Sequence, residues 1–451
     1  MSPADSIDLV AVPAPDETRA LSRLGFEELG LAVGGLDRLH RGIAERAFSA
    51  VGPAGRPVQI AHDKISAGVY CGLRGATALL SRGADAVLAR RPPSGDGRPV
   101  STHPRGGSLL GILNGLTGDE LERRASDLQE PMAVRVNRRA IPVEEAALRA
   151  AFPAAQPRIA VFLHGLMETE GAWKLGGGPT YGERLEHDLD LTAVEIRVNS
   201  GRHISENGRS LADLLEALVA AWPVEFEEMD LIGHSMGGLM VRSACFAGSG
   251  AGHRWPRRVR HVVSLGTPHM GAPLEQAVHW ASAGLHALPE TRPIANFLRR
   301  RSAGIRDLRQ GSLVDEDWRD CDPDALHAAA VGEVPLHEGA THCFVSATTT
   351  RNPRHPVGRL VGDWLVLQPS ATGRSRTRRI PFEEEHGMHV GGAGHFALLN
   401  HPAVYARLRG WLATPPPGSV AAPSGLPAPD GAAIRLPRQA EAEAPKVKGR
   451  G

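Results

Sequence analysis

The chain has 451 residues, 42% of them hydrophobic, which is enough for one large domain with additions or for two to three small ones. Its 51 basic and 50 acidic residues give a formal net charge of +1, so the composition does not favour a nucleic-acid footprint over the whole surface. Residues 1–8 lack the basic and apolar segments of a secretory signal, and no stretch of roughly 18 uninterrupted apolar residues occurs that would cross a membrane. We therefore expect a cytoplasmic protein, with peripheral membrane contact left open.

The four cysteines are far apart in the sequence and have neither metal-binding nor redox spacing. They are Cys71, Cys245, Cys321 and Cys343. This pattern is typical of reduced thiols in a reducing compartment. A disulfide between Cys321 and Cys343 is the alternative.

Residues 1–130 predict a helical module that carries no catalytic motif. After a flexible arm over residues 1–20, apolar residues recur at three- and four-residue steps, as on amphipathic helices. Helices are expected between Gly35 and Gly52, over about residues 60–90 and over 109–128. The module is either a helical hairpin docked on the main domain or a surface for dimerisation or membrane contact.

Near residue 130 the spacing of apolar residues changes from the three- and four-residue steps of a helix to every second residue, as in a strand. Met132, Val134 and Val136 alternate there with less apolar residues. Apolar strands then alternate with helical segments such as residues 208–222. This order predicts an α/β fold with a mainly parallel sheet covered on both faces and right-handed connections. Strands are expected at 158–163, 194–198, 229–232, 261–265 and 342–346.

The gap before the strand at 342–346 is about 75 residues, more than one crossover needs. Residues 273–340 are therefore expected to form a cap or lid over the C-terminal edge of the sheet. The sequence becomes rich in Pro and Ala near its end, which predicts disorder over 413–451. Residues 131–412 then make up the predicted catalytic domain.

Gly233-His-Ser-Met-Gly237 has the G-x-S-x-G pattern of a nucleophile elbow. The flanking positions must be Gly, because the strained backbone of the serine brings strand and helix too close for a Cβ. Leu231 and Ile232 supply a buried strand before the turn, and residues 239–241 begin a helix after it. The pattern predicts Ser235 as the nucleophile.

Cleavage of an ester by a serine also needs two N–H donors for the tetrahedral oxyanion. The strand at 158–163 runs directly into His164-Gly165, where the backbone N–H of Leu166 could face Ser235. The second expected donor is the N–H of Met236, the residue after the nucleophile.

With these motifs the chain resembles the α/β-hydrolase superfamily, in particular bacterial lipases and esterases similar to GPI-inositol-deacylase-like lipases. The resemblance covers roughly residues 130–412 and not the helical module. The motifs that carry it are His164-Gly165-Leu166, Gly233–Gly238, Gly266-Thr-Pro-His-Met-Gly271, Gly362-Asp-Trp-Leu-Val366 and Gly394–Pro402.

In that superfamily the order along the chain is nucleophile, acid, base. The resemblance therefore implies Ser235 as nucleophile, Asp363 as acid and His395 as base. Because Trp364 stands where family members often have a small residue, the aspartates between Asp315 and Asp324 are the fallback for the acid.

Four histidines, 386, 389, 395 and 401, compete for the role of base. His395 is preferred because Gly394 permits a close approach and Phe396, Leu398 and Leu399 can anchor the loop in the core. A final strand is expected before it at 378–382, and a closing helix after it with Val404, Leu408, Trp411 and Leu412. His386 and His389 beside Glu383–Glu385 also suggest zinc, but a solvated loop is favoured and no metal or other cofactor is expected.

The predicted function is hydrolysis of a carboxylic ester, of lipase or esterase type, through an acyl-enzyme. Acyl transfer or thioester hydrolysis by the same triad is the first alternative, and a scaffold or membrane-associated protein with a vestigial hydrolase domain is the second. The expected partner is a small-molecule or lipid ester and not a nucleic acid. Homo-oligomerisation or membrane contact through the N-terminal helices is left open.

Overall fold

The computed structural model describes residues 17, 19–27, 56–89, 99–272, 302–321, 331–352, 354–375 and 377–414. The expected helix between Gly35 and Gly52, most of the predicted insertion and the tail after residue 414 lie outside the described residues.

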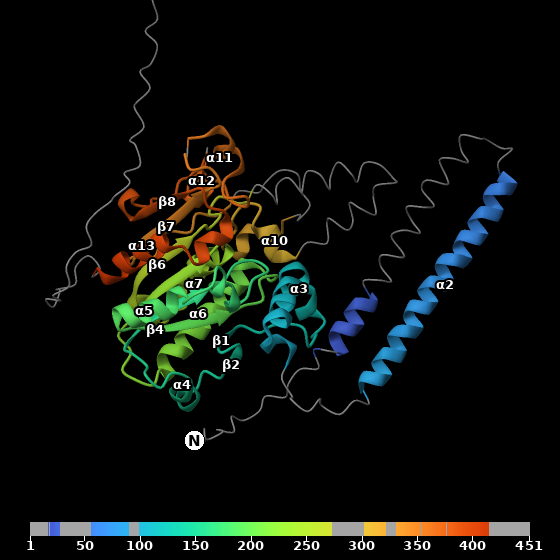
Figure 1. The fold of residues 1–451 in the computed structure, drawn as a ribbon, viewed down its shortest axis with the longest axis horizontal. Coiled ribbons are helices and arrows are strands. Elements are labelled where there is room, and N and C mark those ends of the chain that lie inside the picture. Colours follow the sequence, from blue (N-terminus) through green and yellow to red (C-terminus); the bar gives the residue numbers. More distant parts are fainter. Residues whose placement is uncertain are drawn as a thin grey trace, which may run out of the picture. The chain divides into compact units, whose positions relative to one another are not determined.

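Within the described residues, eight strands form one sheet in the order β2-β1-β4-β3-β5-β6-β7-β8, which Figure 1 shows from its lower part, at β2, to its upper part, at β8. The strands are β1 (Ala133–Val136), β2 (Arg139–Ile141), β3 (Arg158–Leu163), β4 (Thr192–Arg197), β5 (Glu228–His234), β6 (Val259–Leu265), β7 (Thr341–Thr348) and β8 (Gly387–Gly391). β1 pairs antiparallel with β2 and β4, and every pair from β4 to β8 is parallel. The predicted α/β fold with a mainly parallel sheet is confirmed.

Alternation along the strands creates two hydrophobic layers. On β3, Val161 and Leu163 pack on one face, whereas Ala160 and Phe162 pack on the other, as a period of two requires. The first layer is covered by α4 (Glu145–Ala151), α6 (Ile204–Ala221) and α7 (Met236–Gly250), and the second by α5 (Tyr181–Leu189) and α13 (Pro402–Ala413). Both faces are buried, which explains why the central strands are nearly continuous apolar runs.

The described chain has further α-helices. They are α2 (Arg56–Ala89), α3 (Pro104–Arg123), α10 (Ala303–Asp307), α11 (Pro356–Val361) and α12 (Gln368–Ala371). None of the helices in the described ranges is long and apolar enough to cross a membrane. All four cysteines are free thiols, so Cys321 and Cys343 do not pair in this structure.

α3 lies within the predicted N-terminal module, yet it contacts loops of the sheet domain. The Ser302 hydroxyl donates to the carbonyl of Gly115 at 2.6 Å, and the Asn199 amide donates to the carbonyl of Gly118 at 2.9 Å. A Cβ at Gly111 would touch the carbonyl of Glu168. The glycines therefore let α3 approach these loops closely, so this helix is packed as part of the domain that contains the sheet.

One sequence-based strand prediction is wrong. The sequence predicts the last strand at 378–382, whereas the structure forms it at β8, Gly387–Gly391. Ile380 and Phe382 are instead buried beside the sheet with Phe344. In the pairing of β8 with β7, Gly387 lies opposite Phe344. A Cβ at Gly387 would lie 2.4 Å from Cζ of the Phe344 ring, so a larger residue would collide with the ring. Because a glycine-rich strand has few apolar residues, the sequence pattern favours the neighbouring segment 378–382 as the strand.

Candidate active site

Ser235 lies at the turn between β5 and α7 in a strained conformation, with φ of 52° and ψ of −123°. Its N–H donates to the carbonyl of Leu265 at 2.8 Å, which fixes the turn against β6. A Cβ at Gly233 would overlap the backbone of Gly238, and one at Gly237 would overlap the carbonyl of Leu163. The close approach predicted for a nucleophile elbow is therefore present at this serine.

Asp363 and His395 contact each other through their side chains and through their backbones. His395 Nδ1 lies 2.8 Å from Asp363 Oδ2, and the His395 N–H donates to the Asp363 carbonyl at 2.9 Å. The other carboxylate oxygen accepts the N–H groups of Leu365 and Val366 at 3.0 and 2.7 Å. Both side chains are buried, so backbone contacts hold the carboxylate and the carboxylate orients the ring.

The His395 ring lies close to the elbow. Its Cε1 and Nδ1 would be 3.2 and 3.3 Å from a Cβ at Gly266, the residue after the Leu265 that binds the Ser235 N–H. Its Nε2 is buried and has no hydrogen-bond partner. With Nδ1 donating to Asp363, Nε2 is the nitrogen left to receive a proton.

Two backbone N–H groups, those of Leu166 and Met236, are the expected donors to the oxyanion. Met236 is the first residue of α7, so its N–H has no intrahelical partner. On the loop after β3, the N–H of Gly165 donates to Glu168 and that of Met167 to the Ser200 hydroxyl. Among the hydrogen bonds of the described residues none uses the N–H of Leu166, which lies between them. The roles of Leu166 and Met236 stay predictions.

A second carboxylate–imidazole pair, which the sequence reasoning missed, lies beside the first. His234 Nδ1 is 3.0 Å from Glu168 Oε1, and its ring centroid is 4.8 Å from that of His395. Burial disfavours a charged imidazole, but the Glu168 carboxylate outweighs this effect and raises the pKa of His234. Burial alone would raise the pKa of Glu168, but His234 and the Gly165 N–H bring it below its usual value. No sequence motif pairs residues 66 positions apart, so only the fold could reveal this contact.

The fallback acids are occupied elsewhere. The Asp315 carboxylate accepts from Ser205 and Arg209, and Asp317 accepts the N–H of Leu313. Asp322 and Asp324 lie outside the described residues. Of the described aspartates singled out by the sequence, Asp363 is the one that meets His395.

The competing histidines have other contacts. His389 on β8 directs its two ring nitrogens to the hydroxyls of Ser346 and Thr348, at 3.0 and 3.1 Å, and burial lowers its pKa. His401 caps α13, where its ring accepts the N–H of Ala403.

The group considered for zinc consists of two exposed glutamates and a half-buried histidine. Glu383, Glu385 and His386 can each bring one ligand atom to within 4.8 Å of the others, at the surface. His389 is turned to Ser346 and Thr348, so the two-histidine arrangement that suggested zinc does not form. Exposed acidic groups of this kind are common without a metal.

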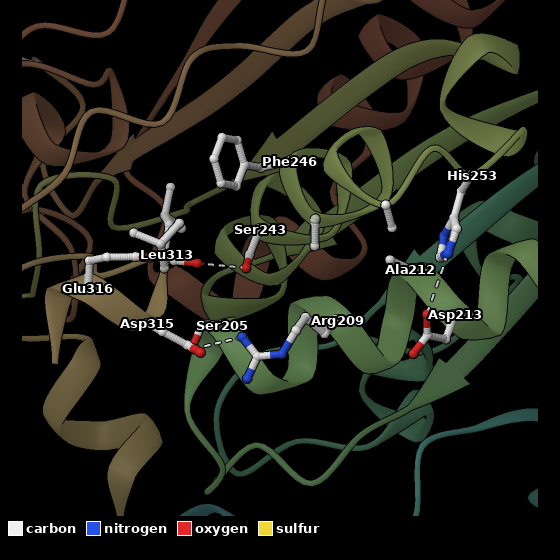
Figure 2. A pocket seen from close by; sticks show the side chains of 13 residues that line it. Ser205, Arg209, Ala212, Asp213, Ser243, Phe246, His253, Leu313, Asp315 and Glu316 are labelled. Atoms are coloured by element: carbon white, nitrogen blue, oxygen red, sulfur yellow. Dashed lines mark hydrogen bonds and ion pairs between the residues drawn. The ribbon is translucent and has the colours of Figure 1, made fainter. Parts of the chain in front are cut away.

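A pocket of about 300 Å³ lies on the face of the sheet covered by α6 and α7, and Figure 2 shows its lining. Arg209 pairs with Asp315 at one side, and Asp213 faces His253 at the other, 3.6 Å apart. The Phe246 side chain also lines the pocket. None of Ser235, Asp363 and His395 lines this pocket, so it is separate from the candidate active site.

The sheet order, the elbow after β5 and the carboxylate–imidazole pair beyond β7 and β8 define an α/β-hydrolase fold. A family model described as "PGAP1-like alpha/beta domain" matches residues 189–318, which run from the end of α5 through the elbow. The fold is thus that of the α/β-hydrolases, and residues 189–318 are similar to the PGAP1-like domain.

Similar solved structures include three bacterial proteins. The Bacillus licheniformis lipase BlEst2 in its propeptide form is 19% identical, with a TM-score of 0.40 over 60% of this chain and 53% of that chain. EstA from Clostridium botulinum is 13% identical, with a TM-score of 0.35 over 57% and 87% of the two chains. The Legionella pneumophila phospholipase PlaB is 13% identical, with a TM-score of 0.36 over 57% and 60%. The chain spans about half of the BlEst2 propeptide form, and no curated protein matches its sequence.

Proposed function

We propose that the protein is a serine hydrolase that cleaves carboxylic esters. The observation that carries this proposal is the buried pair in which His395 Nδ1 lies 2.8 Å from Asp363 Oδ2, while Nε2 has no hydrogen-bond partner and the ring lies beside Gly266. A general base needs an orienting acid on one nitrogen and a free lone pair on the other. This arrangement supports nucleophilic attack by Ser235.

In the proposed reaction, Ser235 Oγ attacks the ester carbonyl carbon as its proton moves to His395 Nε2. The N–H groups of Leu166 and Met236 stabilise the resulting oxyanion. The carbon–oxygen bond to the alcohol breaks as His395 returns the proton to the leaving oxygen, which gives an acyl-enzyme. Water, deprotonated by His395, then releases the acid and regenerates Ser235.

The surroundings support an apolar ester, such as a lipid ester, as the substrate. Trp364 and Phe396 directly follow the acid and the base in the sequence, and they are 70% and 52% exposed. Large apolar side chains beside a catalytic centre favour contact with an acyl chain or an apolar alcohol. The natural substrate is therefore proposed to carry at least one such group.

The test is Ser235→Ala, assayed with p-nitrophenyl esters of graded acyl length and with a fluorophosphonate probe. We expect turnover to fall by at least about ten-thousandfold and labelling to vanish, because the nucleophile is removed while binding groups remain. Ser249→Ala, at an exposed position of α7, is the matched control and should keep both signals. Unchanged hydrolysis by a folded Ser235→Ala protein would overturn the proposal, and ester formation on addition of alcohol would shift it to acyl transfer.

A further inference from the structure

His234 and Glu168 connect the three loops that meet at the candidate active site. His234 directly precedes Ser235, Glu168 lies on the loop that carries Leu166, and His395 supplies the facing carbonyl. Glu168 Oε2 accepts the Gly165 N–H at 2.7 Å and lies 3.1 Å from His234 Nδ1. His234 Nε2 lies 3.4 Å from the His395 carbonyl oxygen. Neither Glu168 nor His234 takes part in a step of the proposed esterase reaction.

The contacts indicate the protonation state of His234. A carboxylate and a carbonyl oxygen accept hydrogen bonds and do not donate them. Both ring nitrogens of His234 face such acceptors, so hydrogen bonds at both nitrogens require the protonated, cationic ring. Its side chain is fully buried and that of Glu168 is 8% exposed, and an ion pair at this depth needs each partner to offset the cost of burying the other.

Gly165 shows how near this pair is to the nucleophile. A Cβ at Gly165 would lie 2.9 Å from Ser235 Cβ and 3.2 Å from Glu168 Oε2. The carboxylate therefore holds the backbone segment that touches the nucleophile. An unpaired carboxylate here would oppose the negative charge that develops on the substrate oxygen. The cation on His234 cancels that charge.

We infer that Glu168 and His234 form an ion pair that positions the oxyanion loop against Ser235 and neutralises the Glu168 charge beside the developing oxyanion. This inference rests on the proposed function. The pair acts through the Gly165 backbone and through its charge, so both members are positioning residues. Other charged groups that face His234 are Asp363, which pairs with His395, and His395 itself at 4.8 Å between ring centroids.

The decisive experiment compares His234→Gln, Glu168→Gln and the double variant in the full chain. His234→Gln leaves a buried, unpaired carboxylate, so kcat should fall about a hundredfold, and the acid limb of the kcat/KM profile should move to higher pH because an added negative charge favours protonated His395. Glu168→Gln should lose about tenfold, since an amide oxygen still accepts from Gly165. The double variant should be about tenfold more active than His234→Gln, because it no longer carries the unpaired charge.

His261→Gln is the matched control. His261 Nδ1 lies 2.7 Å from the buried Asp230 carboxylate on β5, so the variant also breaks a buried pair, but at a distance from the elbow. It should lower stability without moving the pH profile, and no rescue should follow from Asp230→Asn. A double variant at residues 168 and 234 that is no better than His234→Gln would overturn the charge role.

A readout independent of catalysis separates the two proposals. Nitrogen-15 NMR of the imidazoles near pH 7 should show both nitrogens of His234 protonated in the wild type, and one unprotonated in Glu168→Gln. A neutral His234 in the wild type would overturn the ion pair even if ester hydrolysis is observed. Conversely, a doubly protonated His234 in a protein whose Ser235→Ala variant keeps its activity would leave the pair standing and refute the proposed function.

Discussion

His395 and Asp363 contact each other through both backbone and side chain, although 32 positions separate them. The His395 N–H donates to the Asp363 carbonyl, and the ring nitrogen Nδ1 faces the carboxylate of the same residue. The loop that carries the histidine is therefore anchored to the loop that carries the acid. The backbone contact holds the His395 backbone beside Asp363, within reach of its carboxylate.

Asp363→Asn is expected to lower kcat by about ten-thousandfold with little change in fold. The amide oxygen can still accept the N–H groups of Leu365 and Val366, but the amide NH₂ then faces His395 Nδ1 and favours the tautomer with hydrogen on Nε2. Steady-state hydrolysis of a p-nitrophenyl ester checks this. Asp315→Asn, which changes the fallback acid, should keep most of the activity, and the reverse result would transfer the role of acid to Asp315.

His395→Ala is expected to lose at least about a thousandfold in turnover, as removal of a triad base does. His389→Ala should lose much less, because its ring contacts Ser346 and Thr348, and His401→Ala should mainly weaken the cap of α13. Turnover and melting temperature of the three variants distinguish these effects. An inactive but folded His389→Ala protein beside an active His395→Ala protein would show that the base is misassigned.

The central strands could be predicted from the sequence because they are buried on both faces and read as apolar runs, as in residues 158–163 and 261–265. The strand–turn–helix at Ser235 could be predicted because the elbow demands Gly at fixed positions. β8 could not be predicted from the sequence, because its pairing with β7 depends on the space that Gly387 leaves for the Phe344 ring. The contact of Glu168 with His234 could not either, because it arises only when the β3 and β5 loops meet at one edge of the sheet.

Trp364→Gly is expected to stabilise the fold by about 1 kcal/mol and to reduce activity towards long-chain esters. Trp364 has φ of 88°, a conformation that strains any bulky residue and that Gly adopts freely. Its side chain is 70% exposed, so little packing is lost. Thermal unfolding should show a rise of about 2–4 °C. A chain-length series of esters checks the second effect, and equal activity losses for short and long chains would argue against contact of Trp364 with the acyl chain.

Gly233→Ala is expected to destabilise the protein by about 3 kcal/mol, because the added methyl would overlap the backbone at Gly238, which cannot move without shifting α7. Denaturant unfolding measures this. Gly410→Ala in α13 is the matched control, since a Cβ there meets nothing within 4 Å. It should stabilise the helix by about 0.5–1 kcal/mol. Equal effects at the two positions would contradict the tight strand–helix approach at the elbow.

Arg197 links the region before residue 131 to the loop after β3. Its buried guanidinium donates to Glu130 at 2.5 Å, to Glu170 at 2.5 and 2.6 Å and to the carbonyl of Ser101 at 3.3 Å. α3 lies against the same loop, where a Cβ at Gly115 would overlap Met167. Removing one partner of such a buried pair costs roughly 3–5 kcal/mol, because the remaining charge stays buried.

A chain that begins at residue 131 is therefore expected to lose its stable fold, whereas one that begins at residue 99 should still label at Ser235 with a fluorophosphonate. The shorter chain lacks α3, Ser101 and Glu130, so Arg197 and the loop that carries Leu166 lose their supports. The longer chain keeps all three. Melting temperatures and labelling rates of both truncated proteins, compared with the full chain, measure the difference. If the chain from residue 131 is folded and labels at the full rate, α3 is dispensable and its contacts with the oxyanion loop have no role in holding it.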